Sequence, residues 1–135
     1  MKRSSAWAVA AVLFWALLVG MGKPPGPEVP VPDINFTATV RDDQDITTKV
    51  SNTSWGGNIY FTGLRGKGTV TISFEKVKKV TAVGTGKGNR SDFQITLKNG
   101  DVVAVSFDNE DTFLGTTNFG TYRILAKNLK EIIFH

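Results

Sequence analysis

The chain of 135 residues contains no cysteine and a single histidine, His135, which is its last residue. Without cysteine it can form no disulfide, no thiolate nucleophile and no thiolate metal ligand. A chain end usually frays, so His135 is a poor place for a catalytic base. The sequence therefore predicts a protein that is not an enzyme, with no catalytic residue, no metal site and no cofactor.

Proline is absent after Pro32, because all five prolines lie within residues 24–32. Proline fixes φ and has no backbone N–H, so this density forbids both helix and strand pairing and favours an extended spacer. We interpret residues 23–33 as a linker. A docking motif for a proline-binding partner is the alternative.

Charge is absent from residues 6–19, an apolar run that follows the basic start Met-Lys-Arg at residues 1–3. Gly20 and Gly22 then provide the small residues of a cleavage site, so residues 1–22 are predicted to be a signal peptide. The run is short for a spanning helix, which needs about 20 apolar residues. An uncleaved membrane anchor and a buried core helix are the alternatives. The predicted location is periplasmic or secreted, with membrane contact only if the segment is uncleaved.

The positive charge is small once this segment is removed. The formal net charge is +4, and without Lys2 and Arg3 there remain 14 basic and 12 acidic residues, a net charge of +2. Nucleic-acid binding relies on a concentrated basic surface, so nucleic acid is not a predicted partner.

Helical periodicity is also missing from the domain predicted over residues 34–135. Alternation of apolar and polar residues, as in residues 93–97, is typical of half-buried strands. Asn99-Gly100 is a strong signal for a hairpin turn because both positions tolerate positive φ. The expected strands are residues 34–40, 46–50, 59–62, 69–74, 93–97, 102–107, 112–114, 121–125 and 131–134. Residues 52–58 are predicted to be a loop, 75–80 a helical turn before a strand or a continuation of the sheet, and 84–90 a flexible connector.

The chain resembles itself when it is shifted by 52 positions. The shift superimposes Phe61 on Phe113, Gly63 on Gly115, Gly68 on Gly120, Thr69 on Thr121, Ile72 on Ile124 and Lys78 on Lys130. Residues 36–40 match residues 93–97 at a shift of 57. We interpret this as an internal duplication, with repeats at about 34–83 and 91–135, and chance similarity between two glycine-rich segments as the alternative.

The predicted fold is all-β, with two similar antiparallel units packed as a small sandwich or a partly closed barrel. One unit of this size would expose half of its apolar side chains, so each is expected to cover the other. The predicted core residues are Phe36, Val40, Ile46, Phe61, Val70, Ile72, Val80, Phe93, Ile95, Leu97, Val103, Val105, Phe113, Tyr122, Ile124, Leu129 and Ile132.

Residues 97–132 resemble a pattern found in small β modules of many exported bacterial proteins. The pattern is L-x-x-G-x-x-V, then a threonine with an aromatic-glycine pair, an isoleucine and I-x-x-I; here it includes Gly100, Phe119-Gly120 and Ile124. Such modules are largely uncharacterised, so the resemblance implies a fold and an envelope location but no catalytic residue. The proline that often follows the isoleucine is replaced by Leu125-Ala126. Residues 97–108 also have a faint likeness to Sm-type small barrels, without RNA-contacting residues.

Trp55, which is followed by Gly56 and Gly57, and Tyr60 are candidates for a platform on which a sugar ring or a partner stacks. A tryptophan that covers one end of a small barrel is the alternative. Basic residues in the first repeat could bind an anionic glycan or lipid headgroup, or could simply be solvated. The candidate ligand-binding residues are Trp55, Tyr60, Arg65, Lys67, Lys78 and Lys79, within a basic bias that also includes Lys76, Lys87 and Arg90.

The acidic clusters at residues 42–45 and 108–111 lack the spacing of a calcium loop, and acidic residues in turns usually accept hydrogen bonds from their own backbone. The glycine-rich segments at residues 63–68 and 84–88 do not fit a phosphate-binding loop and open no helix.

Two functions remain open at this stage. The first is a non-enzymatic envelope protein that binds or scaffolds a partner protein through strand edges or loops. The second is a binding module for an anionic glycan or lipid headgroup that uses the basic first repeat and Trp55. The sequence does not indicate an oligomeric state.

Overall fold

The computed structural model describes residues 31–135, which fold into ten β-strands and two short 3-10 helices. The strands are β1 (Ala38–Asp42), β2 (Thr47–Trp55), β3 (Tyr60–Arg65), β4 (Gly68–Ser73), β5 (Val77–Thr85), β6 (Arg90–Leu97), β7 (Val102–Asp108), β8 (Thr112–Thr117), β9 (Gly120–Leu125) and β10 (Leu129–Phe134). The 3-10 helices are η1 (Phe74–Lys76) and η2 (Ala126–Asn128). The prediction of an all-β fold is confirmed.

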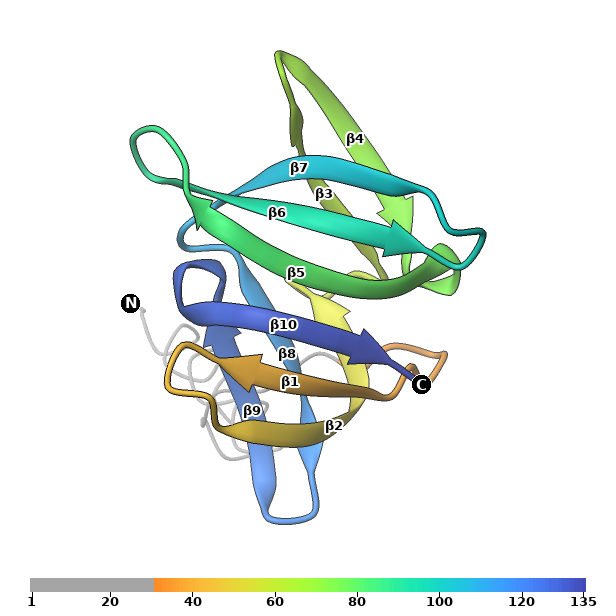
Figure 1. Cartoon of the computed structure of the whole chain (residues 1–135). Helices are drawn as coiled ribbons and strands as arrows, with labels where there is room; N and C mark the ends of the chain where they lie inside the picture. Colours follow the sequence, from red (N-terminus) through yellow and green to blue (C-terminus); the bar gives the residue numbers. More distant parts are fainter. Residues whose placement is uncertain (1–30) are drawn as a thin grey trace, which may run out of the picture.

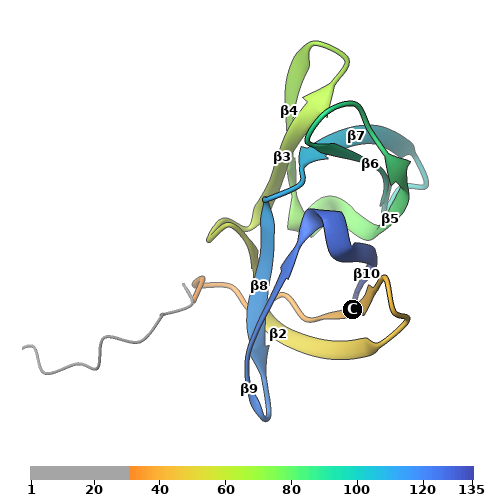
Figure 2. The same ribbon diagram turned by 90° about the vertical axis from the view of Figure 1, so that its left-hand side faces the viewer.

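All ten strands belong to one antiparallel sheet in the order β4-β3-β7-β6-β5-β10-β1-β2-β8-β9. We call β4-β3-β7-β6-β5 the first half-sheet and β10-β1-β2-β8-β9 the second half-sheet. The two join where β5 pairs with β10, with Val80 opposite Ile132 (Figure 1). The sheet curls into a half-barrel (Figure 2), which is nearer to the predicted partly closed barrel than to a sandwich of two sheets.

The strand order reads the same from both ends when each strand is exchanged for the strand five places away along the chain. The first half-sheet is one continuous segment, residues 60–108, whereas the second combines residues 38–55 with residues 112–134. Strands β1 and β2 therefore pair with β10 and β8, from the other end of the sequence. The predicted segments 34–83 and 91–135 are interleaved and do not form two separately packed units.

Two glycines lie where strands from distant parts of the chain approach closely. A Cβ at Gly63 of β3 would lie 2.5 Å from Val105 Cγ1 and 2.7 Å from the carbonyl oxygen of Ser106. A Cβ at Gly115 of β8 would lie 2.8 Å from the carbonyl oxygen of Ser51. Since no side chain fits at these distances, the pairing of β3 with β7 and of β8 with β2 requires glycine.

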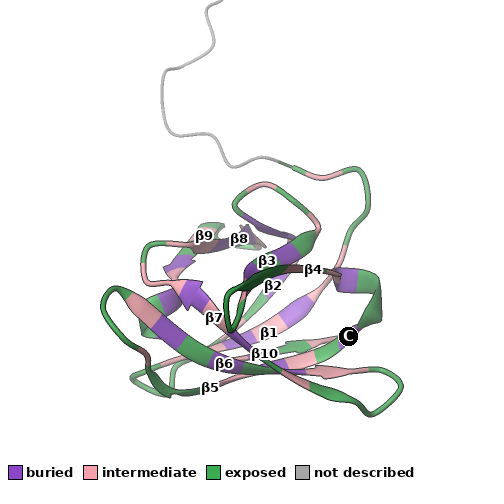
Figure 3. Cartoon of the chain, turned by 90° about the horizontal axis from the view of Figure 1, so that it is seen from above, coloured by how far each residue is buried: buried purple, intermediate pink, exposed green. Residues whose placement is uncertain are grey.

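Aromatic side chains form the core between the two half-sheets. Phe61 and Phe113 stack with ring centroids 6.5 Å apart and 14° between their planes. Phe74 and Phe134 pack beside them with centroids 5.0 Å apart. Figure 3 shows buried positions alternating with exposed ones along several strands, as expected of strands with one face on the core. The core is thus continuous across the junction of the half-sheets.

The predicted core residues are buried or half-buried with one exception. Ile46 is 57% exposed, so its assignment to the core is wrong. It lies in the turn between β1 and β2, where its backbone N–H donates to Asp42 Oδ1 at 3.0 Å and its side chain faces solvent. Buried apolar residues that the sequence analysis left out of the core are Ala38, Val50, Trp55, Phe74, Val77, Phe107, Leu114 and Ala126.

Local structure differs from prediction in three segments and resolves one alternative. The strand predicted over residues 34–40 begins only at Ala38, and the connector predicted over residues 84–90 is shorter, because β5 extends to Thr85 and β6 begins at Arg90. The loop predicted over residues 52–58 is wrong in its first half, because β2 continues to Trp55 through an irregularity at Asn52, which has a φ of 50°. Residues 75–80 end η1 and then continue as β5, as the first alternative stated. The hairpin turn at Asn99-Gly100 is confirmed, but of its two residues only Gly100, with a φ of 96°, adopts a positive φ.

The predicted signal peptide, residues 1–22, and most of the predicted linker, residues 23–33, lie outside the described residues. Within residues 31–135, no helix has the length and apolar character needed to cross a membrane.

Candidate ligand-binding grooves

The six predicted ligand-binding residues lie in three separate places. Trp55 ends β2 and Tyr60 begins β3, while Arg65 and Lys67 belong to the β3–β4 hairpin. Lys78 and Lys79 lie on β5, which is separated from β3 by β6 and β7. The six residues therefore do not form one site.

Trp55 is mostly buried, with 6% of its surface exposed. Its ring packs against Phe107 at a centroid distance of 4.5 Å and against Phe61 at 5.1 Å. This burial agrees with the alternative prediction, in which Trp55 covers one end of the barrel, and not with an exposed ligand platform. Tyr60 is 38% exposed.

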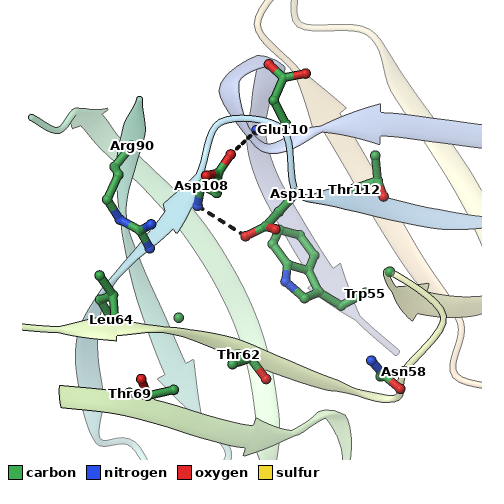
Figure 4. A pocket seen from close by; sticks show the side chains of 12 residues that line it. Trp55, Asn58, Thr62, Leu64, Thr69, Arg90, Asp108, Glu110, Asp111 and Thr112 are labelled. Atoms are coloured by element: carbon green, nitrogen blue, oxygen red, sulfur yellow. Dashed lines mark hydrogen bonds between the residues drawn. The ribbon is translucent and has the colours of Figure 1, made fainter. Parts of the chain in front are cut away.

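A first groove, of about 520 Å³, lies beside Trp55 where β3 diverges from β7 and β8 (Figure 4). Its lining residues are Trp55, Gly56, Asn58, Thr62, Gly63, Leu64, Thr69, Arg90, Asp108, Glu110, Asp111 and Thr112. The groove has an acidic wall from the loop between β7 and β8. Figure 4 shows this wall above the indole ring.

The carboxylates of Asp108 and Asp111 in the acidic wall accept hydrogen bonds from backbone N–H groups of their own loop. Asp108 Oδ1 accepts a hydrogen bond from the Glu110 N–H at 2.8 Å, and Asp111 Oδ2 accepts one from the Asp108 N–H at 3.1 Å. Burial raises the pKa of the Asp111 carboxyl above its ordinary value. No group of acidic or histidine side chains within residues 31–135 is arranged to hold a metal ion. The wall thus stabilises the loop, as expected for acidic residues in turns.

A second groove, of about 610 Å³, lies over β7 between the β3–β4 hairpin and the β5–β6 hairpin. Its lining residues are Leu64, Arg65, Gly66, Val83, Lys87, Arg90, Asp92, Phe93, Gln94, Ala104, Val105 and Ser106. It meets the first groove at Leu64 and Arg90, which line both. Three cationic side chains and one carboxylate therefore face one concave surface.

Both arginines of the second groove are anchored on β7. Arg90 Nε donates to Ser106 Oγ at 2.9 Å, and Arg90 Nη2 donates to the Ser106 carbonyl oxygen at 2.8 Å. Arg65 Nη1 donates to the Ala104 carbonyl oxygen at 3.2 Å. Carbonyl groups two residues apart on a strand point to the same edge, so the two guanidinium groups meet along one edge of β7. Each guanidinium group keeps N–H donors that form no hydrogen bond to β7, so the pair can donate hydrogen bonds to a bound anion.

Lys87 and Arg90 belong to the predicted basic bias but are not among the six predicted ligand-binding residues. Their position in the flexible connector and at the start of β6 gave no local signal. Only the pairing of β3 with β7 places Arg65 beside them. Lys67 lies at the tip of the β3–β4 hairpin and does not line the second groove.

Residues 32–135 match the model of a family described as "Uncharacterised protein", and the chain belongs to this family. No curated protein and no solved structure shows a significant match to the chain.

Proposed function

We propose that the chain is a non-enzymatic binding protein of the cell envelope, periplasmic or secreted, which binds a partner protein by strand addition at β4. Export rests on the predicted signal peptide, residues 1–22, and the proline-rich residues 23–33 would hold the domain clear of the membrane or cleavage site. The single observation that carries the proposal is the uncharged strand β4 at the edge of the sheet, which pairs on one side only within the described part of the chain.

Among residues 31–135, strand β4 ends the sheet and leaves every second backbone group without a strand partner. The Phe74 N–H donates to the Ile59 carbonyl oxygen at 3.0 Å, which marks residues 59 and 74 as a hydrogen-bonded pair. Such pairs alternate along an antiparallel ladder, so Ile72, Val70 and Gly68 also bond to β3. The backbone groups of Thr69, Thr71 and Ser73 then face the open edge, where a partner strand would bond.

Residues of β4 lack the usual protection of an edge strand. The sequence Gly-Thr-Val-Thr-Ile-Ser contains no charge and no proline, whereas soluble proteins commonly place one or the other on an exposed edge. Val70 and Ile72 are half-buried, so an added strand with apolar residues at alternate positions would cover them. The opposite edge of the sheet is β9. There the Ala126 N–H donates to the Asp111 carbonyl oxygen, so Ile124 and Tyr122 also bond to β8, and the backbone groups of Arg123 face outward. This edge therefore carries a charged residue, unlike β4.

Thr69→Pro is the sharpest test of strand addition, because it removes one outward N–H and no bond to β3. Thr121→Pro is the matched control, since Thr121 occupies the same place on the β9 edge. The measurement is partner capture from envelope extract by the two variants and the unchanged protein. We expect Thr69→Pro to lose capture and Thr121→Pro to keep it.

Equal capture by all three proteins would contradict strand addition at β4. Equal loss in both variants, with unfolding midpoints in urea that also fall equally, would instead reveal a general effect on the sheet. The midpoints are therefore measured beside the capture.

We also infer that the two halves of the chain arose by duplication of one five-strand unit. The palindromic strand order and the matching glycines, Gly63 and Gly115, support this inference. Strands β3, β4 and β5 match β8, β9 and β10 at the shift of 52. The pairings of β1 with β10 and of β6 with β5 instead equate Val40 with Ile95, a shift of 55 and not the predicted 57. Each half-sheet would then take two strands from one copy and three from the other.

An anionic ligand is the second candidate function, and the second groove favours it with a changed set of residues. Arg65 is retained from the prediction, and Lys87 and Arg90 join it. Trp55, Tyr60, Lys67, Lys78 and Lys79 do not line this groove.

A further inference from the structure

The second groove concentrates positive charge, although the Arg90 guanidinium also faces the carboxylates of the first groove. Within residues 31–135, none of Arg65, Lys87 and Arg90 forms an ion pair with a carboxylate. Asp92 is the one carboxylate of the lining, so three positive charges and one negative charge leave the groove with a formal charge of +2. Unpaired cations around a concave surface attract and hold anions.

The guanidinium groups are fixed before any ligand arrives. Arg90 uses two of its five N–H donors on Ser106, and Arg65 uses one on Ala104. Two residues of a strand span about 7 Å, so the two anchoring carbonyl groups are near neighbours. A single tetrahedral oxyanion between the arginines can accept hydrogen bonds from both, and side chains that are already ordered lose little entropy on binding.

The second half-sheet lacks this arrangement. Arg65 pairs with Gly68 at the end of the β3–β4 hairpin, and Thr117 holds the same place opposite Gly120 in the β8–β9 hairpin. The cationic groove is therefore a feature of one half-sheet and is not required by the backbone plan that both share.

We infer that the second groove binds a phosphate monoester carried by a hydroxylated or glycerol-like group. A phosphate monoester carries a charge of about −1.5 to −2 at pH 7, which balances the groove better than a single carboxylate would. Lys87 contributes a mobile ammonium group, while Asp92 and Gln94 offer acceptors and donors to neighbouring hydroxyl groups. The floor over Val83 and Ala104 accommodates the carbon skeleton. This inference deepens the second candidate function and is independent of strand addition at β4.

The test uses the full chain and isothermal titration with glucose 1-phosphate, inorganic phosphate and glucose. We expect glucose 1-phosphate to bind, inorganic phosphate to bind more weakly, and glucose to give no signal. The double variant Arg65→Gln/Lys87→Gln should lower the affinity for glucose 1-phosphate by about tenfold or more, because it removes charge-assisted hydrogen bonds.

Lys78→Gln/Lys79→Gln is the matched control, since it removes the same charge from β5. Lys78 is five residues from Val83, or about 16 Å along an extended strand. We expect it to change the affinity by less than about twofold, because charges at this distance are largely screened at physiological salt. Equal losses in the two double variants, or equal binding of glucose and glucose 1-phosphate, would overturn the inference.

A second arm distinguishes a soluble ligand from a lipid headgroup. Vesicles of phosphatidylcholine with and without phosphatidic acid, which is also a phosphate monoester, are sedimented with the protein. Co-sedimentation that requires phosphatidic acid and falls in Arg65→Gln/Lys87→Gln identifies a lipid source, whereas binding of glucose 1-phosphate alone identifies a soluble one. Absence of binding in both arms refutes the inference. Thr69→Pro should bind both probes normally, so failure of this site and failure of strand addition are separate results.

Discussion

The two half-sheets share a backbone plan but differ in the side chains that fill and cover it. Gly63 and Gly115 permit the same close approach of strands, and Phe61 and Phe113 meet in the core. In contrast, η1 places Phe74 in the core where η2 places Ala126. The shared residues are those that the backbone geometry requires. The half-sheets differ in the volume of their core side chains and in their surface charge, and these differences can give one half-sheet a function that the other lacks.

The largest expected effect comes from the unequal core. Phe74→Ala should lower the free energy of unfolding by about 4 kcal/mol, because Phe74 is 1% exposed and packs against Phe61 at 4.7 Å and Phe134 at 5.0 Å between ring centroids. Urea unfolding followed by tryptophan fluorescence measures the loss. Phe119→Ala is the control, since Phe119 is 79% exposed, and it should change stability by less than about 0.5 kcal/mol. Similar losses in both variants would show that Phe74 does not organise the core.

The next effect tests what the half-sheets share. Gly63→Ala and Gly115→Ala should each cost about 2 to 3 kcal/mol, because the new Cβ would meet a backbone carbonyl oxygen that cannot move without shifting a strand. The same urea titrations measure both variants, and the two losses should agree closely.

Gly68→Ala controls for the intrinsic effect of replacing glycine. At Gly68 the nearest atom to a new Cβ is the Arg65 carbonyl oxygen at 3.7 Å, an ordinary contact. Its cost should stay below about 0.5 kcal/mol. A large loss at Gly63 with none at Gly115 would break the proposed equivalence of the half-sheets.

A smaller effect concerns the matching turns before β2 and β7. Gly100 has a φ of 96°, and Asp45 in the corresponding turn has a φ of 63°. Gly100→Ala should cost about 1 kcal/mol, since alanine resists positive φ. Gly100→Asn should cost less, because asparagine tolerates the left-handed region. Equal stability of both variants in thermal unfolding would show that this turn is not strained by a side chain.

Local chemistry explains how much of this fold could be predicted. Alternation in residues 93–97 and the turn at Asn99-Gly100 act over a few residues, so the sequence predicted both correctly. Ile46 fits the pattern of a strand. The Asp42 carboxylate, however, accepts a hydrogen bond from the Ile46 N–H, which holds Ile46 in a turn with its side chain exposed. The periodicity of apolar residues does not show whether a side-chain acceptor will bind a backbone N–H and replace strand pairing with a turn.

Pairing between distant strands could not be predicted in the same way. The shift of 52 residues identified similar segments, but similarity does not state whether strands pair within one copy or across copies. The candidate site was the least predictable feature for this reason. Arg65 and Arg90 become neighbours only because both bind β7, which lies between their strands. Trp55 was wrongly predicted to be a ligand platform because a tryptophan followed by two glycines is typical of an exposed loop. The pairing of β2 with β8 instead places it in the core.

The smallest effects distinguish two aspartates by pH. Lys130 and Arg41 hold the pKa of Asp45 below its ordinary value of 3.8, with Lys130 Nζ at 2.9 Å from Asp45 Oδ1. A depressed folded-state pKa stabilises the fold above the ordinary value, and this contribution is lost as pH falls through the folded-state pKa. Asp45→Asn should therefore be less stable than the unchanged protein at pH 7, and the difference should disappear in strong acid.

Asp111 should behave with the opposite sign, because burial raises its pKa. A raised pKa favours the fold below the ordinary value and loses that contribution as pH rises through the folded-state pKa. Asp111→Asn keeps an acceptor for the Asp108 N–H, which Asp111 now binds at 3.1 Å, and removes the charge that burial disfavours. It should be slightly more stable than the unchanged protein at pH 7 and equal to it near pH 3. Urea titrations of both variants from pH 7 down to about pH 2 measure these differences. Stability changes of the same sign in the two variants would show that one of the two carboxylates is not governed by the contacts described here.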